Sequence, residues 1–200
     1  MSFNEDKYMK VTNLLSDDIC KIVERYALFD RINDYEKDNQ VPGSHSKYAD
    51  QLMESILLFL KPIIEKHTGL KLLPTYSFYR IYEPNNILDI HTDRPSCEVS
   101  VTIPIGIKYV DKPPDYKWPL YVNVKGEKRY INCDVGEGII YKGCELEHGR
   151  DVFNVAKDSY QIQLFLHYVD ANGPYSNEYK YDGRINVGIK KNQVFPFIIT

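Results

Sequence analysis

The sequence has no long hydrophobic run, no apolar leader and no excess of positive charge. No apolar run approaches the roughly 20 residues that cross a bilayer, so we expect no membrane partner. The first residues, MSFNEDKYMK, include acidic side chains and no apolar stretch, which argues against a secretory signal. The formal net charge is −3. Nucleic-acid binders usually carry a basic excess, so a nucleic-acid partner is not expected either.

The cysteines also lack any recognisable pattern. The four thiols show no CxxC spacing and no dense framework; they are Cys20, Cys97, Cys133 and Cys144. This spacing argues against a disulfide scaffold and against a structural zinc site. It predicts reduced thiols in a cytoplasmic protein.

What is present suits one globular domain with a helical N-terminal part. The chain has 200 residues, of which 43% are hydrophobic. Ser16, followed by two aspartates, predicts the start of a helix that runs to about residue 32. A second apolar stripe predicts a helix over 47–67, with Pro62 inside it and Gly69 after its end. Two amphipathic helices need a surface to cover, and that surface should be a sheet.

From Leu70 onward the pattern changes to short β-rich runs broken by turn residues. The predicted strands are 70–73, 76–83, 87–92, 97–105, 119–124, 128–133, 137–142 and 159–169. Eight short strands predict an α+β protein with a double-sheet jelly roll. We expect one domain over 1–200, with helices in 1–69, the jelly roll in 70–170 and a cover in 171–200. The apolar ending, residues 194–200, is predicted to pack back on the body as a final strand.

His91 and Asp93 lie two residues apart in a predicted strand, so both side chains project from the same face. A His-x-Asp pair on its own is weak evidence for a metal site. However, an imidazole and a carboxylate that reach one point can supply two of the three ligands of a ferrous site. The third ligand must be a histidine from elsewhere, and His148, 55 residues after Asp93, is the best-placed candidate.

These residues stand in a longer pattern, with Lys157 nine positions after His148 and the run WPLYVNV…VGEGIIYKG before it. The pattern resembles the Fe(II)/2-oxoglutarate-dependent dioxygenases, in particular their prolyl-4-hydroxylase-like branch, over about residues 70–170. The resemblance implies a double-stranded β-helix (jelly-roll, cupin-like) core buttressed by two N-terminal helices. It implies Fe(II) on His91, Asp93 and His148, with 2-oxoglutarate and O₂ as cosubstrates and ascorbate as the reductant in vitro. Tyr82 falls where the family often places a tyrosine that hydrogen-bonds 2-oxoglutarate.

The far carboxylate of a buried 2-oxoglutarate needs a cation, because an unpaired buried charge is costly. The family spacing favours Lys157, whose predicted strand face also carries Ser159, Gln161 and Gln163. Arg150 lies two residues after His148 and shares its face in an extended segment. Arg150 could bind substrate, pair with a carboxylate or replace Lys157 as the anchor.

Two further arginines are candidates for substrate binding. Arg80 shares a strand face with Tyr82, so it could meet an anionic group of the substrate or pair with Asp89 or Glu98. Arg94 follows the metal-binding turn and could contact substrate or brace that turn, and we favour bracing. His167 is interpreted as a core or rim residue, since a fourth protein ligand would block oxygen.

The sequence therefore predicts an oxygenase that hydroxylates an unactivated C–H bond while 2-oxoglutarate is decarboxylated to succinate and CO₂. The substrate would be a small molecule or a peptide, with prolyl and amino-acid hydroxylation among the possibilities. Two alternatives stay open: a cupin-type metalloenzyme that does not use 2-oxoglutarate, and a non-catalytic β-sandwich binding module. The oligomeric state is not determined by the sequence, nor is the choice between 108–118 and 171–187 as a lid.

Overall fold

The computed structural model describes residues 3–33 and 36–189. Its helices are α1 (Phe3–Asp6), α2 (Asp17–Asn33), α3 (Gln51–Thr68) and α4 (Ser176–Tyr179), with 3-10 turns η1 (Pro95–Cys97) and η2 (Lys180–Gly183). Its strands are β1 (Tyr8–Val11), β2 (Glu36–Lys37), β3 (His45–Tyr48), β4 (Leu72–Tyr82), β5 (Leu88–His91), β6 (Val99–Lys108), β7 (Leu120–Val124), β8 (Glu127–Ile131), β9 (Gly138–Tyr141), β10 (His148–Arg150) and β11 (Tyr160–Asp170).

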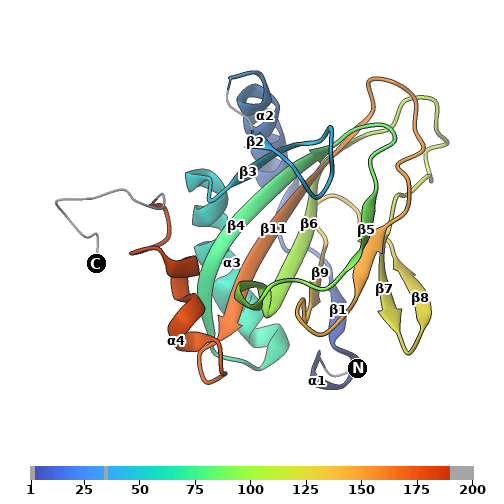
Figure 1. The fold of residues 1–200 in the computed structure, drawn as a ribbon. Helices are drawn as coiled ribbons and strands as arrows, with labels where there is room; N and C mark the ends of the chain where they lie inside the picture. The colour runs from blue at the N-terminus through green and yellow to red at the C-terminus, as the bar shows by residue number, and fades with distance from the viewer. Residues whose placement is uncertain (1–2, 34–35, 190–200) are drawn as a thin grey trace.

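The described strands form two antiparallel sheets. The major sheet has seven strands in the order β1-β9-β6-β11-β4-β3-β2, and the minor sheet has four in the order β5-β10-β7-β8. Figure 1 shows the minor sheet on one side of the major sheet, with α2 and α3 on the other side. The predicted α+β class, with a double-sheet core covered by two helices, is confirmed.

Local sequence explains where the two long helices begin and end. The Ser16 hydroxyl accepts from the backbone N–H of Ile19, as predicted for the start of α2. In α3 the Asp50 carboxylate accepts from the N–H groups of Leu52 and Met53. Gly69 ends this helix with a φ of 73°, a left-handed conformation that glycine adopts without strain.

The central strand β11 shows how each face of the major sheet is used. Its alternate residues Ile162, Leu164, Leu166 and Tyr168 belong to the apolar core under the helices. The intervening residues Gln161, Gln163, Phe165 and His167 line the space between the two sheets. One face of the sheet therefore supplies stability and the other supplies polar groups to an interior site.

The N-terminal part contains more strand than predicted. Residues 47 and 48, which we expected in a helix, belong to β3, and the helix itself begins at Gln51. β1 pairs with β9, and β2 and β3 extend the sheet beyond β4. β2 and β3 are short and polar, and β1 has only four residues, so none of the three shows a strand pattern of its own. They become strands because the sheet edges offer them hydrogen-bonding partners.

Two predictions within the jelly roll also need correction. The expected strands 70–73 and 76–83 are one strand, β4, which continues through Pro74 with a register shift opposite His167 and Tyr168. The three-residue strand β10 was not predicted, although it carries His148. The expected final strand over 194–200 lies outside the described residues.

The segment after β11 packs on the edge of the body near β4. Arg184 is buried and donates to Glu54 of α3 at 2.5 Å and to the carbonyl of Thr75 at 2.8 Å. Asp182 accepts two hydrogen bonds from Arg94, at 2.6 and 2.9 Å. The C-terminal segment is thereby tied to both α3 and the turn after β5.

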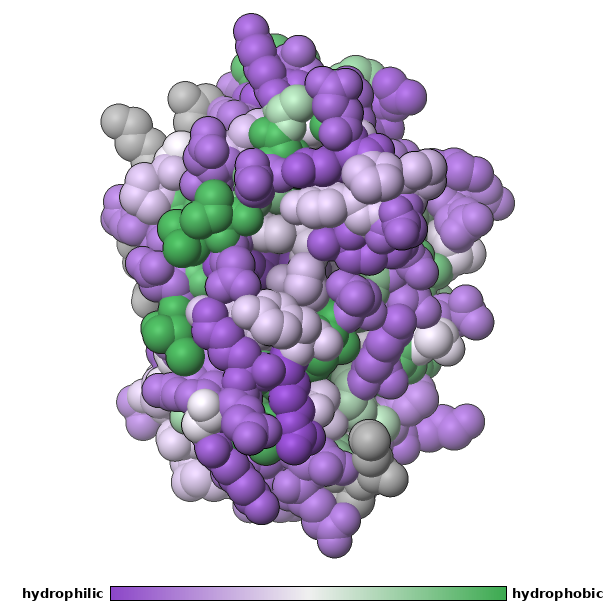
Figure 2. Space-filling model, turned by 90° about the vertical axis from the view of Figure 1, so that its right-hand side faces the viewer, coloured by the Kyte–Doolittle hydropathy of each residue, from purple (hydrophilic) through white to green (hydrophobic). Residues whose placement is uncertain are grey.

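The outer surface is mixed in character. Figure 2 shows the side that carries the minor sheet, where hydrophilic residues predominate and hydrophobic ones form small separate groups. Among the described residues, this face shows no large contiguous apolar patch. Among the described residues, no helix has the length and apolar character needed to cross a membrane.

The packing of α3 leads to a stability prediction. Leu60 is fully buried under the sheet, whereas Leu58 on the same helix is 45% exposed. Leu60→Ala should lower the free energy of unfolding by about 2–5 kcal/mol, because it leaves a cavity in the core. Leu58→Ala should change it by less than about 1 kcal/mol. Urea denaturation of the two variants measures this difference, and equal losses would contradict the assignment of the buried face.

Candidate metal centre

Two histidines meet where β5 and β10 pair. His91 ends β5 and His148 begins β10, and the antiparallel register places the two residues directly opposite each other. Their ring centroids lie 4.4 Å apart. Residues 57 positions apart in the chain are therefore neighbours on one face of the minor sheet.

Asp93 completes the cluster. Its Oδ1 lies 3.5 Å from the Nε2 of His91 and 3.5 Å from the Nε2 of His148. Three ligand atoms bound to one ion at roughly 2.1 Å would lie about 3 Å apart, so the observed spacing fits a shared ion with small adjustments. The Asp93 backbone N–H donates to the carbonyl of Gly143, where a Cβ would overlap the Asp93 carboxylate.

Backbone carbonyls set the tautomers of both imidazoles. His91 Nδ1 lies 2.8 Å from the carbonyl oxygen of Asp89, and His148 Nδ1 lies 2.9 Å from that of Leu146. A carbonyl can only accept, so each Nδ1 carries the hydrogen and each Nε2 keeps its lone pair in the neutral ring. Such bonds usually orient histidines that bind metals. The donor set, two imidazole lone pairs and one carboxylate oxygen, fits an iron ion.

The electrostatics keep Asp93 ionised. Burial raises the pKa of this carboxyl, but the His148 and His91 rings, which donate to it from Nε2 when they are protonated, outweigh burial and hold the pKa well below its usual range. Conversely, burial lowers the pKa of His91, but the hydrogen bonds with Asp93 and with the Asp89 backbone, together with the Asp93 charge, raise it above its usual value. The Ser100 hydroxyl donates to the other carboxylate oxygen at 3.0 Å. The carboxylate is thus available as an anionic ligand at neutral pH.

A second group of possible ligands, Asp93 with Cys97 and His167, lies behind the first. Burial raises the pKa of the Cys97 thiol, and its sulfur lies 3.0 Å from the Tyr76 hydroxyl. His167 is buried and hydrogen-bonded to Ser100 at 2.9 Å. A protonated thiol is a poor metal ligand. The cluster of His91, Asp93 and His148 is therefore the better candidate, and His167 is a buried residue as predicted.

Arg150 and Tyr82 lie together between the sheets. Arg150 is 3% exposed, and its guanidinium lies 4.8 Å from the Trp118 ring and 5.9 Å from that of Tyr82. One terminal nitrogen donates to the Trp118 carbonyl, whereas Nε has no partner among the described residues. Gln161, Gln163 and Thr102 line a small cavity of about 10 Å³ beside it. Arg150 is therefore a buried cation with unused donor capacity.

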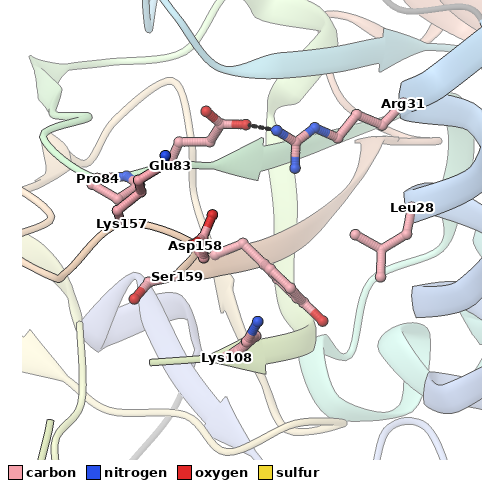
Figure 3. A pocket seen from close by; sticks show the side chains of 9 residues that line it. Leu28, Arg31, Glu83, Pro84, Lys108, Lys157, Asp158 and Ser159 are labelled. Atoms are coloured by element: carbon pink, nitrogen blue, oxygen red, sulfur yellow. Dashed lines mark ion pairs between the residues drawn. The ribbon is translucent and has the colours of Figure 1, made fainter. Parts of the chain in front are cut away.

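Lys157 lies elsewhere, in an exposed turn before β11. Figure 3 shows it on the same side of an outer pocket as Glu83 and Pro84, with Arg31 and Leu28 of α2 across from them. That pocket has a volume of about 400 Å³. The prediction that Lys157 and Ser159 continue the inward face of the last strand is therefore corrected. Residues 151–159 are irregular, so the inward face begins only at Gln161.

The two other predicted arginines have acidic partners. Arg80 is 2% exposed and donates to Asp38 at 2.5 Å, rather than to Asp89 or Glu98. Arg94 holds Asp182 with two hydrogen bonds and stacks over Tyr76, so it braces the turn after β5. Arg80 and Tyr76 face a cavity of about 260 Å³ that reaches Asp93. Neither arginine offers an unpaired charge to this cavity.

Sequence reasoning missed the residues that close this cavity from the N-terminal side. Asp38 and Gln40 line it, although both lie between the two predicted helices, in a stretch for which the sequence predicted no role. The remaining lining residues are aromatic or imidazole side chains, namely Tyr76, Phe78, Tyr141, Phe165 and His167. No motif marks Asp38 or Gln40, because the hairpin of β2 and β3 must fold over the barrel before they approach it.

Neither the family models nor the curated proteins include a match to the sequence. Solved structures do match. A Pseudomonas putida prolyl-4-hydroxylase has 13% identity and a TM-score of 0.64, covering 82% of this chain and 94% of its own. A Trichoplax adhaerens prolyl hydroxylase in complex with a hypoxia inducible factor peptide has 12% identity and a TM-score of 0.61, covering 82% and 85%. HygX from Streptomyces hygroscopicus, with nickel, 2-oxoglutarate and hygromycin B bound, has 10% identity and a TM-score of 0.62, covering 85% of each chain.

At sequence identities of 10–13%, these structural matches show a shared fold only. The chain has the double-stranded β-helix fold of the 2-oxoglutarate/Fe(II) oxygenases, and prolyl hydroxylases are among the structures it resembles. The resemblance predicted from the sequence is confirmed at this level.

The buried His167 leads to a prediction about pH. Burial lowers its pKa from 6.5 to about 4. Below pH 6.5 the unfolded chain takes up a proton at this histidine that the folded protein does not, so stability falls as the pH drops from 6.5 to 4. The free energy of unfolding lost over this pH range is about 3 kcal/mol. His167→Asn should show a smaller loss of unfolding free energy over this range in urea denaturation. Parallel curves for the two proteins would contradict the assignment.

Proposed function

We propose that this protein is an Fe(II)/2-oxoglutarate-dependent oxygenase. The observation that carries the proposal is the placement of the Nε2 atoms of His91 and His148, each 3.5 Å from the ionised Asp93 carboxylate, at the wall of an interior cavity. Two imidazoles and one carboxylate on one face of an octahedral iron leave three positions for other ligands. When bound, iron with 2-oxoglutarate and O₂ supplies oxidative decarboxylation to succinate and CO₂ together with oxidation of a C–H bond.

Within this proposal, Arg150 holds the far carboxylate of 2-oxoglutarate. It is a fully enclosed cation with an unpaired Nε, and a buried donor without an acceptor is costly unless a ligand meets it. Tyr82 lies beside it and shares the interior of the barrel. Lys157, favoured by the family spacing, lies in an exposed turn. Position in the fold therefore supports Arg150 over Lys157.

The cavity beside the triad supports a compact substrate group. Its volume of about 260 Å³ falls below the roughly 300–1,000 Å³ of pockets for drug-sized ligands. Its walls include Phe78, Phe165 and Tyr76, which suit an aliphatic group. Since Asp38 neutralises Arg80, the suggestion that Arg80 meets an anionic group of the substrate loses its basis. We propose hydroxylation of an aliphatic C–H bond on an amino acid or on a peptide residue, such as a prolyl ring.

The cytoplasmic location stays a prediction. All four cysteines are unpaired, which fits the reduced thiols expected from the sequence. The oligomeric state also remains outside this proposal.

Turnover without a known substrate tests the reaction class. Purified protein with Fe(II), ascorbate and 2-oxoglutarate under air should form succinate, and His91→Ala should reduce the rate by at least about 100-fold because it removes a metal ligand. Mass spectrometry of succinate measures both rates. Iron binding without binding of 2-oxoglutarate would instead favour a cupin-type metalloenzyme, and binding of neither would leave a non-catalytic module.

A second experiment separates the two candidate anchors. Arg150→Gln should raise the KM for 2-oxoglutarate by roughly 10- to 100-fold, because it removes charge-assisted hydrogen bonds. Lys157→Gln makes the same change of side-chain charge in the exposed turn, so its KM should match the wild type. A raised KM in the Lys157 variant alone would reverse the assignment.

A further inference from the structure

The side-chain amide of Gln40 contacts Nε2 of His91, the atom that would bind the metal. Its Nε2 is 2.9 Å from the Nε2 of His91. The Nδ1 hydrogen of that imidazole is directed to the Asp89 carbonyl, so the neutral ring presents a lone pair at Nε2. The amide N–H therefore donates into this lone pair.

The orientation of the Gln40 amide is set from its other end. Arg80 donates to the Gln40 Oε1 at 2.8 Å, and an arginine can only donate. The oxygen of the amide must therefore face Arg80, which leaves the nitrogen facing His91. The alternative orientation would place a carbonyl oxygen against the His91 lone pair.

The backbone around Gln40 is also held in place. The N–H groups of Gln40 and Val41 both donate to Asp38 Oδ1, and Asp38 Oδ2 accepts from Arg80 Nε. Val41 is fully buried, in a cluster with Tyr82 and Trp118. Asp38 and Gln40 thereby form one wall of the 260 Å³ cavity next to Asp93.

We propose that Gln40 gates the metal site by competing with the metal for the Nε2 lone pair of His91. One lone pair cannot serve both partners, so metal binding at the triad must break the Gln40 contact. Because Gln40 also lines the cavity, metal loading repositions part of the wall that a substrate would touch. The coupling is reciprocal: the factor by which the contact weakens metal binding is the factor by which the metal weakens the contact. The inference rests on the proposed metal site.

Metal affinity provides the first test. Co(II) is titrated into the full chain and followed by its visible absorption. Gln40→Ala should bind Co(II) about 2- to 10-fold more tightly than the wild type, because one competing hydrogen bond is lost. Asn39→Ala, which removes the amide of the neighbouring residue, is the matched control and should leave the Kd unchanged. Gln40 is exposed, so the variant should fold, and circular dichroism checks this.

A second variant separates a gate from a merely structural residue. Gln40→Glu keeps an oxygen for Arg80 but loses the N–H that donates to His91. Gln40→Glu should therefore also bind Co(II) more tightly than the wild type, whereas Asn39→Asp, which adds the same charge at the neighbouring residue, should not. An unchanged Kd in Gln40→Ala or in Gln40→Glu overturns the gate while leaving the proposed function in place. A wild type that binds no Co(II) overturns both.

Discussion

Two imidazole rings, each with its Nε2 3.5 Å from one buried carboxylate, form the constraint on which this structure depends. The arrangement requires β10 to pair with β5 in the register that sets His148 opposite His91. It also requires carbonyls at Asp89 and Leu146 to hold the ring hydrogens away from the centre. Gly143 leaves the space that the Asp93 carboxylate occupies. A buried carboxylate without such partners would be driven toward its protonated form, which binds metal poorly.

The interior between the sheets handles charge in two different ways. Arg80 forms an ion pair with Asp38 and donates to two further oxygen acceptors, so its donors are satisfied by groups of the protein. Arg150 is as deeply buried, but its Nε has no protein acceptor among the described residues. Paired cations of the first kind hold segments in place, whereas a buried cation with unused donors suits an anionic ligand. The contrast distinguishes the arginine that fastens the β2–β3 hairpin from the arginine that can anchor a carboxylate.

Local sequence signals predicted most of the architecture because they act over short distances. The serine at the start of α2, the glycine after α3 and the alternation along β11 each determine an element from neighbouring residues alone. The predictions that proved wrong concern segments whose conformation depends on a distant partner. β3 and β10 are short and polar, and they are strands only because β4 and the pair β5 and β7 bind them.

The same distinction applies to the site. The sequence alone marked His91 and Asp93 as candidate ligands, since two residues of one strand face share a location wherever that strand lies. It also marked His148 as the candidate for the third ligand, which the family pattern supported. Only the tertiary structure decided which cation is enclosed, because the irregular segment 151–159 keeps Lys157 outside while Arg150 points inward from β10. It alone brought Gln40 to His91, across 51 positions of the chain. Spacing in a sequence predicts neighbours within an element, whereas contacts between elements depend on how loops close and sheets pair.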